Sequence, residues 1–428
     1  MMRRYFKSIL VLGIISAFFL LLAPSQEIPD RDEMHSILSA QGIQGNRNEA
    51  FISLCDSLYP AGTWQTAMRG LNRLAPLTIT KLQFQNDIHP PLYFMLLHIV
   101  YRLSDNVLFT GYIFQLVLIL LFILILTVWQ KKTAFQVIIL MGLLPGLFLP
   151  FAEIRHYGLT LIWAALAVWL LEKLKAHWSY KYFILFLIVV AGGTLTHYLF
   201  TAWIVSLLLS ASFTWNKKRN LLLLILGFLL IDALLILAIP DFRMQIIHLS
   251  SLDTGFTGVF HNRFINLLYS IVGLFFPVWS SKLMGYGLIQ ILLLLPALGW
   301  VLYCNWGITK NFTKHAFLIT GSFIFIGGYT LFYLGEEMPI HAGGVKYLAL
   351  ACIGFVPFMF DLITTIKRPI LLSSLFWIIF CTTEFTSRLR DRTEIKEICQ
   401  ADQTFYARSA DVFSTLRFIS SMPPEKKI

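Results

Sequence analysis

Apolar runs long enough to cross a lipid bilayer recur along almost the whole of this chain. Of its 428 residues, 57% are hydrophobic and only 13% are charged, whereas roughly a quarter of an ordinary soluble domain is charged. A soluble core of this size could not bury so much apolar surface, but a bilayer can, because each helical crossing takes about 17–25 apolar residues. The sequence therefore predicts an all-α polytopic membrane protein.

Eleven runs are predicted to be membrane-spanning helices: 8–24, 107–129, 134–151, 157–171, 182–197, 198–213, 220–238, 286–303, 316–334, 345–361 and 369–385. The stretch 182–213 is too long for one crossing, so we divide it after Gly192 and Gly193, where polar residues follow. The first run has the basic start of a secretory signal but a poor cleavage site, which favours an uncleaved helix.

The positions of lysine and arginine predict the orientation of these helices. With the N-terminus inside, the inner segments hold fifteen basic residues and the short outer loops hold five, which is the bias of the positive-inside rule. The inner set is Arg3, Arg4, Lys7, Lys131, Lys132, Lys173, Lys175, Lys181, Lys217, Lys218, Arg219, Lys310, Lys314, Lys367 and Arg368. This pattern is typical of loops beside anionic lipid and argues against a nucleic-acid partner.

Two shorter runs, 89–103 and 264–276, would reverse this orientation if they crossed, so we expect helices embedded in the outer leaflet. Residues 1–385 are then one transmembrane domain, whose first outer loop, 25–88, contains amphipathic patterns at 32–40 and 63–74 that predict helices lying on the membrane. A short outer tail follows at 386–428. Cys55 and Cys399 both fall outside and can pair, whereas Cys352 is expected to be a small apolar packing residue.

The polar residues that could do chemistry gather at the predicted outer ends of the helices. They are Asp30, Asp32, Glu33, Asp87, His89, Glu153, Arg155, His156, Tyr157, His197, Tyr198, Glu336, Glu337, His341, Lys346 and Tyr347. Ionisable residues are costly within a bilayer and usually serve function there. Carboxylates can orient or deprotonate an acceptor hydroxyl, and arginine, lysine and histidine can hold a phosphate leaving group.

Each of these residues also has a purely structural interpretation. Acidic residues can solvate a helix end, Arg155 can anchor at the interface, and His197 can bond a neighbouring helix. Lys346 can extend towards the headgroups. The functional interpretation is favoured by their grouping on one predicted side of the membrane.

The motifs in this order resemble those of bacterial membrane glycosyltransferases of the GT-C fold, the group that includes protein O-mannosyltransferases and the lipid A aminoarabinose transferase. The matching pieces are Asp32-Glu33, His89-Pro90-Pro91-Leu92-Tyr93, Glu153-x-Arg155-x-Tyr157, Thr196-His197-Tyr198 and Lys346-Tyr347-Leu348. They cover most of residues 1–360. The HPPLY segment, with an acidic pair upstream of it, is the most specific of them.

The resemblance implies an inverting transfer from a polyprenyl-phosphate sugar to a lipid, glycan or protein acceptor, on the periplasmic side of a bacterial inner membrane. It implies catalytic roles for Asp32 and Glu33, and substrate binding by His89, Tyr93, Glu153, Arg155, Tyr157, His197, Tyr198, Lys346 and Tyr347. Lys346 stands where the family usually has arginine, which removes bidentate geometry.

Asp32 and Glu33 are also candidate ligands for Mg²⁺ or Mn²⁺, since carboxylates suit these ions. The sequence does not decide between such a metal and a site that uses arginine and lysine alone.

Two other functions compete with a transferase. A transporter or lipid flippase is one, and Asp232, inside the predicted span 220–238, is the main residue that favours it. Against it, the two halves show no repeat of hydropathy. A polymerase or ligase of surface polysaccharide is the other, with a lipid diphosphate donor.

Overall fold

The computed structural model describes residues 31–42, 75–86, 89–103, 107–239, 242–243, 309–329 and 342–363. Every regular element in these ranges is helical. Three helices are long and apolar enough to cross a membrane, at Phe109–Gln130, Tyr157–Ala176 and Lys218–Ala238, and five shorter apolar helices accompany them. The described part of the chain is thus that of a helical membrane protein.

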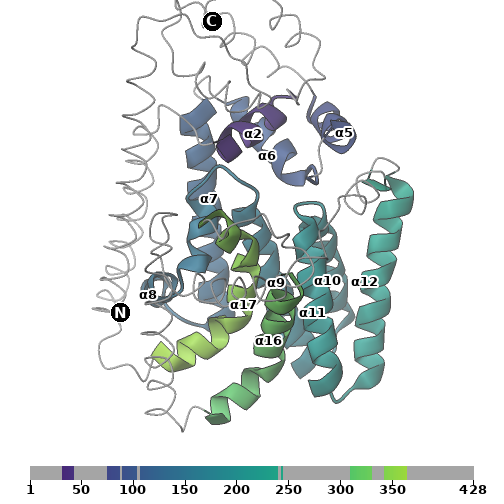
Figure 1. Cartoon of the computed structure of the whole chain (residues 1–428). Helices are drawn as coiled ribbons and strands as arrows, with labels where there is room; N and C mark the ends of the chain where they lie inside the picture. The colour runs from purple at the N-terminus through teal and green to yellow at the C-terminus, as the bar shows by residue number, and fades with distance from the viewer. Residues whose placement is uncertain are drawn as a thin grey trace, which may run out of the picture.

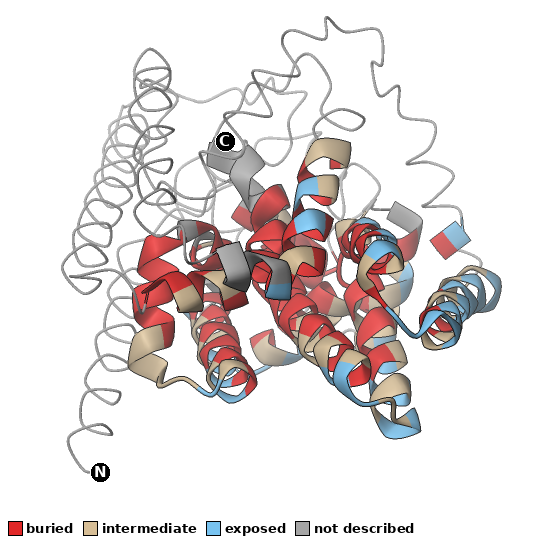
Figure 2. Ribbon diagram, turned by 90° about the horizontal axis from the view of Figure 1, so that it is seen from below, coloured by how far each residue is buried: buried red, intermediate tan, exposed pale blue. Residues whose placement is uncertain are grey.

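The three long helices occupy different places in the bundle (Figure 1). Helix α7 (Val107–Gln130) and helix α9 (Tyr157–Ala176) pack against each other, whereas α12 (Lys218–Ala238) lies at the edge beside α10. In the most apolar stretch of α9, 72% of the residues are buried, against 22% in α12. Figure 2 shows the same contrast, so α9 is central and α12 presents an apolar outer face.

The segment 134–151, predicted as one helix, is interrupted. Helix α8 runs only from Ala134 to Leu143, and two 3-10 turns follow, η2 (Pro145–Leu147) and η3 (Leu149–Phe151). The single-helix prediction is wrong because the Pro145 ring lacks an N–H and disfavours helical backbone at the residue before it.

The long apolar stretch 182–213 divides where the sequence predicted. Helix α10 (Tyr180–Thr194) and helix α11 (Tyr198–Thr214) are joined by a turn in which His197 caps α11. A Cβ added to Gly193 would lie 2.3 Å from the Phe200 ring. Glycine therefore permits the close approach of the two helices.

Three helices gather at one end of the bundle (Figure 1). They are α2 (Arg31–Ala40), α5 (Pro76–Asn86) and α6 (Leu92–Tyr101), and α6 contacts both of the others as well as α7. Helix α6 has ten residues, too few to cross a bilayer, in agreement with the prediction of a helix that does not cross. Helix α2 was expected to lie flat on the membrane. That stays a prediction; the residues from Ser36 to Ala40 are buried, because α2 packs onto α6.

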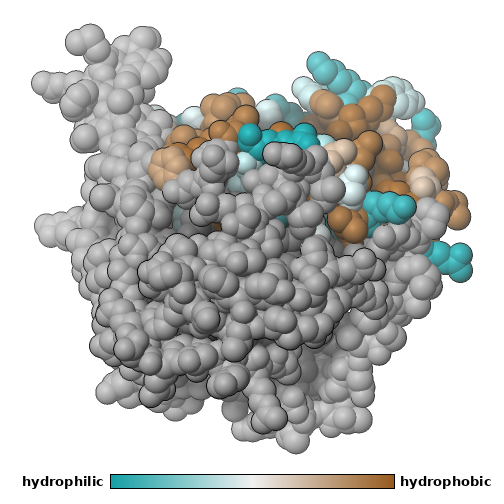
Figure 3. Space-filling view, turned by 90° about the horizontal axis from the view of Figure 1, so that it is seen from above, coloured by the Kyte–Doolittle hydropathy of each residue, from teal (hydrophilic) through white to brown (hydrophobic). Residues whose placement is uncertain are grey.

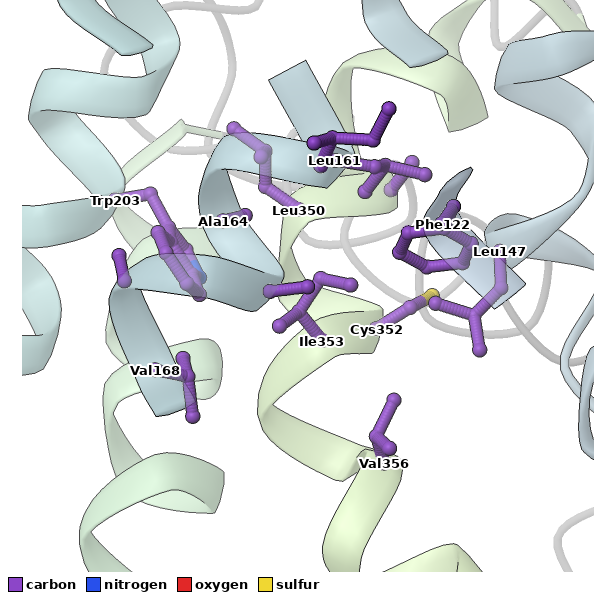
Figure 4. Packing of buried hydrophobic residues seen from close by; sticks show 14 of the residues in the cluster. Phe122, Leu147, Leu161, Ala164, Val168, Trp203, Leu350, Cys352, Ile353 and Val356 are labelled. Atoms are coloured by element: carbon purple, nitrogen blue, oxygen red, sulfur yellow. The ribbon is translucent and has the colours of Figure 1, made fainter. Parts of the chain in front are cut away.

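The core of the described bundle joins α9 to α16 (Thr309–Gly328) and α17 (Ala342–Ile363). Figure 4 shows Leu161 and Ala164 of α9 facing Leu350 and Ile353 of α17, with Trp203 of α11 beside them. Cys352 is buried as a free thiol among these side chains, as expected for a packing residue.

Several lysines of the described helices lie at the opposite end from α2 and α6. Trp129, near the end of α7, donates a hydrogen bond to Glu172 near the end of α9 (2.7 Å). Lys175 lies over the Phe317 ring of α16, and Lys314 of α16 pairs with Asp361 at the end of α17. These contacts bring the ends of α7, α9, α16 and α17 together. The bundle therefore has one end that carries these lysines, which we call the basic end, and one end formed by α2 and α6.

Several predictions lie outside the described residues. These are the spans 8–24, 286–303 and 369–385, the segments 63–74 and 264–276, the tail 386–428, and the pairing of Cys55 with Cys399. The total of eleven spans stays a prediction.

Candidate functional site

Four segments that are distant in the sequence meet at the α2/α6 end of the bundle. They are helix α2, the start of α6, the turn before α9 and the turn between α10 and α11. The backbone N–H of Leu92 donates to the carbonyl of Leu195 (3.0 Å), which joins the start of α6 to the α10–α11 turn. Figure 3 looks onto this end and shows polar side chains among apolar ones on its described surface.

Glu33 fixes α2 against α7 and the turn before α9. Its carboxylate is buried, with 1% of the residue exposed. Its Oε1 accepts hydrogen bonds from the Tyr112 hydroxyl (2.6 Å) and from the backbone N–H of Ile154 (3.2 Å). Because a buried carboxylate is costly unless it is well bonded, these donors hold α2 in one position over the bundle.

Arg155 brings a buried positive charge to the same place. The residue is 4% exposed, and its Nη1 donates to the Ser36 hydroxyl of α2 (3.3 Å). The guanidinium carbon lies 5.7 Å from the centroid of the Tyr157 ring, within the range of a cation–π contact. The turn thus holds the guanidinium between α2 and the first residue of α9.

Gln115 of α7 links two of the predicted site residues. Its Nε2 donates to the Tyr93 hydroxyl (2.9 Å) and to the carbonyl of Arg155 (3.0 Å). Burial raises the pKa of Tyr93 well above its usual range, although the charge on Arg155 opposes this. Tyr93 therefore stays a neutral phenol, and the HPPLY segment is tied to the arginine turn.

Four histidines, one from each of the four segments, lie in ring-to-ring contact. The centroid distances are 5.6 Å from His35 to His89, 5.1 Å from His89 to His156, and 4.5 Å from His156 to His197. His35 and His89 are half-buried, whereas His156 and His197 are buried. We call these four residues the histidine cluster.

His197 has the most sharply defined state in the cluster. Its Nδ1 accepts the backbone N–H of Leu199 (3.0 Å), so the side chain caps helix α11. Burial lowers the pKa of His197 well below its usual range, and the charges of His89 and Arg155 lower it further. The ring is therefore neutral at physiological pH.

The other predicted site residues lie near this end with fewer described contacts. Glu153 is half-buried, and its carbonyl accepts the N–H of Arg155 (2.8 Å). The Tyr198 ring packs on Phe242 (5.5 Å between centroids). Asp32, Lys346 and Tyr347 lie on described helical backbone, but their side chains are outside the described set.

Sequence reasoning missed several residues of this arrangement. His35 completes the histidine cluster, while Tyr112 and Gln115 bond the predicted residues. Tyr112 and Gln115 were detectable in principle, because they are polar, three residues apart and inside an apolar span, where polar residues are costly. His35 stands three residues after Asp32, on a neighbouring position of the helix surface.

The described side chains do not form a metal site. No group of three or more histidine, cysteine, aspartate or glutamate residues in the described ranges is arranged to hold a metal ion. Glu33 directs Oε1 at two hydrogen-bond donors of the protein instead. Binding of Mg²⁺ or Mn²⁺ by Asp32 and Glu33 stays a prediction, and we route no chemical step through it.

Comparison of the chain with protein-family models, with curated proteins and with solved structures gave no match.

The arrangement combines groups that suit an anion bearing an apolar tail. A buried guanidinium, imidazole N–H groups and the N-terminus of α11 all favour negative charge. The apolar helices α7 and α9 both begin at this end of the bundle. The fold and composition place the chain among helical membrane proteins, and this end is its best candidate for a site.

Proposed function

We propose that the protein is an inverting glycosyltransferase that moves a sugar from a polyprenyl-phosphate donor to an acceptor outside the cytoplasm. The acceptor is a lipid, a glycan or a protein. The observation that carries the proposal is the buried Arg155 guanidinium beside the histidine cluster, at the end of apolar helices and next to the acidic helix α2.

The anion-binding groups are suited to the leaving group of such a reaction. In the transfer, the acceptor oxygen forms a bond to the anomeric carbon from the face opposite the phosphate. The bond from that carbon to the phosphate oxygen breaks, and its electron pair stays on polyprenyl phosphate. Arg155 and the imidazole N–H groups can stabilise that charge, because fixed donors in a water-poor site act strongly on developing charge.

The two acidic residues receive different roles. Glu33 holds the turn before α9 through Ile154 and therefore positions Arg155. Asp32 orients the acceptor hydroxyl and takes its proton as the new bond forms. The carboxylate of Glu33 is already bonded to two donors within the described fold.

The decisive test follows the leaving group. The purified protein in lipid nanodiscs would receive a polyprenyl-phosphate sugar and a periplasmic extract, and free polyprenyl phosphate would be quantified. We expect release by the native protein and at least an about 100-fold lower rate for Asp32→Asn, since positioned acid–base groups contribute about 10²–10⁴-fold. Asp361→Asn is the matched control, because Asp361 lies at the basic end.

Equal release by the native protein and Asp32→Asn, with both folded, would move the catalytic role to Asp30 or Glu33. No release from any common polyprenyl-phosphate sugar would contradict the transferase. Under the proposal, the enzyme is a multi-pass protein of the bacterial inner membrane, and the α2/α6 end faces the periplasm.

One observation favours a transporter or flippase as the second candidate. Asp232 lies within the candidate span α12, and the Thr194 hydroxyl of α10 is 3.5 Å from its Oδ1. Carboxylates within the membrane often lie on ion or proton paths. Under this candidate, Asp232→Asn would abolish transport in proteoliposomes, whereas a transferase would keep its release activity.

A further inference from the structure

A small cavity adjoins His197 where helices α9, α11 and α17 meet. It is lined by Tyr157, Thr160 and Leu161 of α9, by His197 and by Leu350 of α17, among others. Its volume is about 10 Å³, which is room for about one water molecule or one oxygen atom of a larger ligand.

The capping bond of His197 decides which ring nitrogen carries the proton. Because Nδ1 accepts the N–H of Leu199, Nδ1 must present a lone pair. A neutral imidazole has one protonated nitrogen, so the proton of the neutral ring lies on Nε2. His197 is thus held as an Nε2–H donor.

This Nε2–H has no acceptor among the described residues. The atom is buried, and no hydrogen bond from it is formed in the described part of the fold. The whole residue is 8% exposed. Buried donors are nearly always bonded to protein, water or ligand, so the acceptor of this N–H lies outside the described residues.

The groups around His197 indicate whether that acceptor is charged or neutral. His156 packs against His197, Tyr157 and His89 lie within ring contact, and His35 follows beyond His89. The Arg155 guanidinium lies over the Tyr157 ring, which in turn contacts the His197 ring. His197 also stands at the N-terminus of α11. These features favour an anionic oxygen over a neutral one.

We propose that the Nε2–H of His197 donates a hydrogen bond to a phosphate oxygen that enters this cavity, and that the imidazole does so as a neutral donor. The identity of the phosphate as a lipid-linked one rests on the function proposed above. The hydrogen bond itself requires no turnover and moves no proton, so it can be tested by binding alone.

The first measurement is the ¹⁵N spectrum of histidine-labelled full-length protein in nanodiscs. The His197 resonances are assigned as those absent from His197→Asn. We expect a neutral ring protonated at Nε2, with an Nε2 shift that changes when a polyprenyl monophosphate is added. Inorganic phosphate is the second arm: a response to both probes indicates a general phosphate site, and a response to the lipid alone indicates a site for the headgroup. No response to either probe, or protonation at Nδ1, would overturn the proposal.

A matched pair of variants tests affinity for the polyprenyl monophosphate. In His197→Asn, the shorter side chain keeps an acceptor for the Leu199 N–H, because asparagine is a favoured N-cap, but it withdraws the donor from the cavity. A hydrogen bond to a charged group contributes enough for an about 10- to 100-fold loss of affinity. His98→Gln is the control, since the buried His98 is bonded to the Ala40 carbonyl (2.8 Å). Equal affinity of His197→Asn and the native protein would contradict the proposal.

These results separate the two proposals. If polyprenyl monophosphate binds with the expected response of His197 but no sugar is transferred from any donor, the transferase proposal is contradicted and the phosphate-site proposal stands. If sugar is transferred but His197 does not respond to lipid phosphate, the phosphate-site proposal is contradicted and the transferase proposal stands.

Discussion

At the scale of single residues, the buried carboxylate of Glu33 is the clearest link between stability and the site. Its short bond from Tyr112 joins α2 to α7 across 79 positions of the sequence. Since the carboxylate is buried, losing one of its donors costs more folding free energy than losing a hydrogen bond at the surface. The same carboxylate fixes the turn that holds Arg155.

We predict that Tyr112→Phe lowers the free energy of unfolding by about 1.5–3 kcal/mol, because a buried acceptor loses a donor and nothing replaces it. Thermal unfolding in detergent measures the change. Tyr180→Phe is the control, because Tyr180 is 69% exposed. Equal melting temperatures for the two variants would contradict the role given to Glu33.

The neutral state of His197 predicts how stability depends on pH. The pKa of His197 is lower in the folded chain than in the unfolded chain, where it is about 6.5. As pH falls below about 6.5, His197 is protonated in the unfolded chain but not in the folded chain. The stability that this group contributes is therefore present above that pH and decreases below it.

Melting temperatures of the native protein and His197→Asn, measured between about pH 7.5 and 5, test this sign. We expect the native protein to lose more stability on the acid side than the variant does. Parallel curves would show that His197 takes up its proton equally in both states.

The sequence identified many residues of the candidate site but could not specify their bonds. Glu33, His89, Tyr93, Arg155, Tyr157 and His197 were chosen for chemical type and predicted side, and the structure places them at one end of the bundle. His35 escaped notice because a lone histidine on a short helix carries no pattern. Its neighbours come from segments more than 50 residues away, and only tertiary packing reveals them.

At the scale of elements, long apolar helices were the easiest to predict. Helices α7, α9 and α12 follow the predicted runs within about five residues at each end, which is near the usual uncertainty of helix boundaries. Helix α8 was overextended because hydropathy alone does not register the effect of Pro145. Helix α5 was not predicted, since its polar and apolar residues show little helical periodicity.

The α10–α11 hairpin gives the sharpest prediction for an element. Alanine at Gly193 would place a Cβ 2.3 Å from the Phe200 ring, and overpacking of this kind costs about 1–3 kcal/mol. Unfolding of Gly193→Ala in detergent should show that loss.

Gly327→Ala in α16 is the matched control, because nothing lies within 4 Å of a Cβ there. Alanine favours a helix over glycine by about 1 kcal/mol, so this variant should be as stable as the native protein or more stable. A Gly193→Ala variant of native stability would show that the hairpin does not need the close approach.

At the scale of the whole molecule, two groups of polar residues lie at opposite ends of the described bundle. One end holds the histidine cluster, Arg155 and Glu33, and the other holds Lys131, Lys132, Lys173, Lys175 and Lys314. Charge alone predicted this separation. Which end faces the cytoplasm follows from the positive-inside rule and is open to direct test.

Single cysteines introduced into a chain whose five native cysteines are replaced by alanine would report the orientation. We predict that an impermeant thiol reagent outside right-side-out vesicles labels Leu103→Cys, at the α6 end, where Leu103 is 80% exposed. Lys218→Cys, exposed at the basic end, should react only after the membrane is opened. The reverse pattern would contradict the orientation.

The central claim is that lipid phosphate binds at the end that carries the histidine cluster. The most direct measurement is photocrosslinking with a polyprenyl phosphate that bears a photoreactive group beside its phosphate, followed by peptide mapping. We predict crosslinks within residues 153–157 and 196–199 that excess unlabelled polyprenyl phosphate removes. Competed crosslinks confined to the basic end, around residues 131–132 and 173–175, would contradict the account.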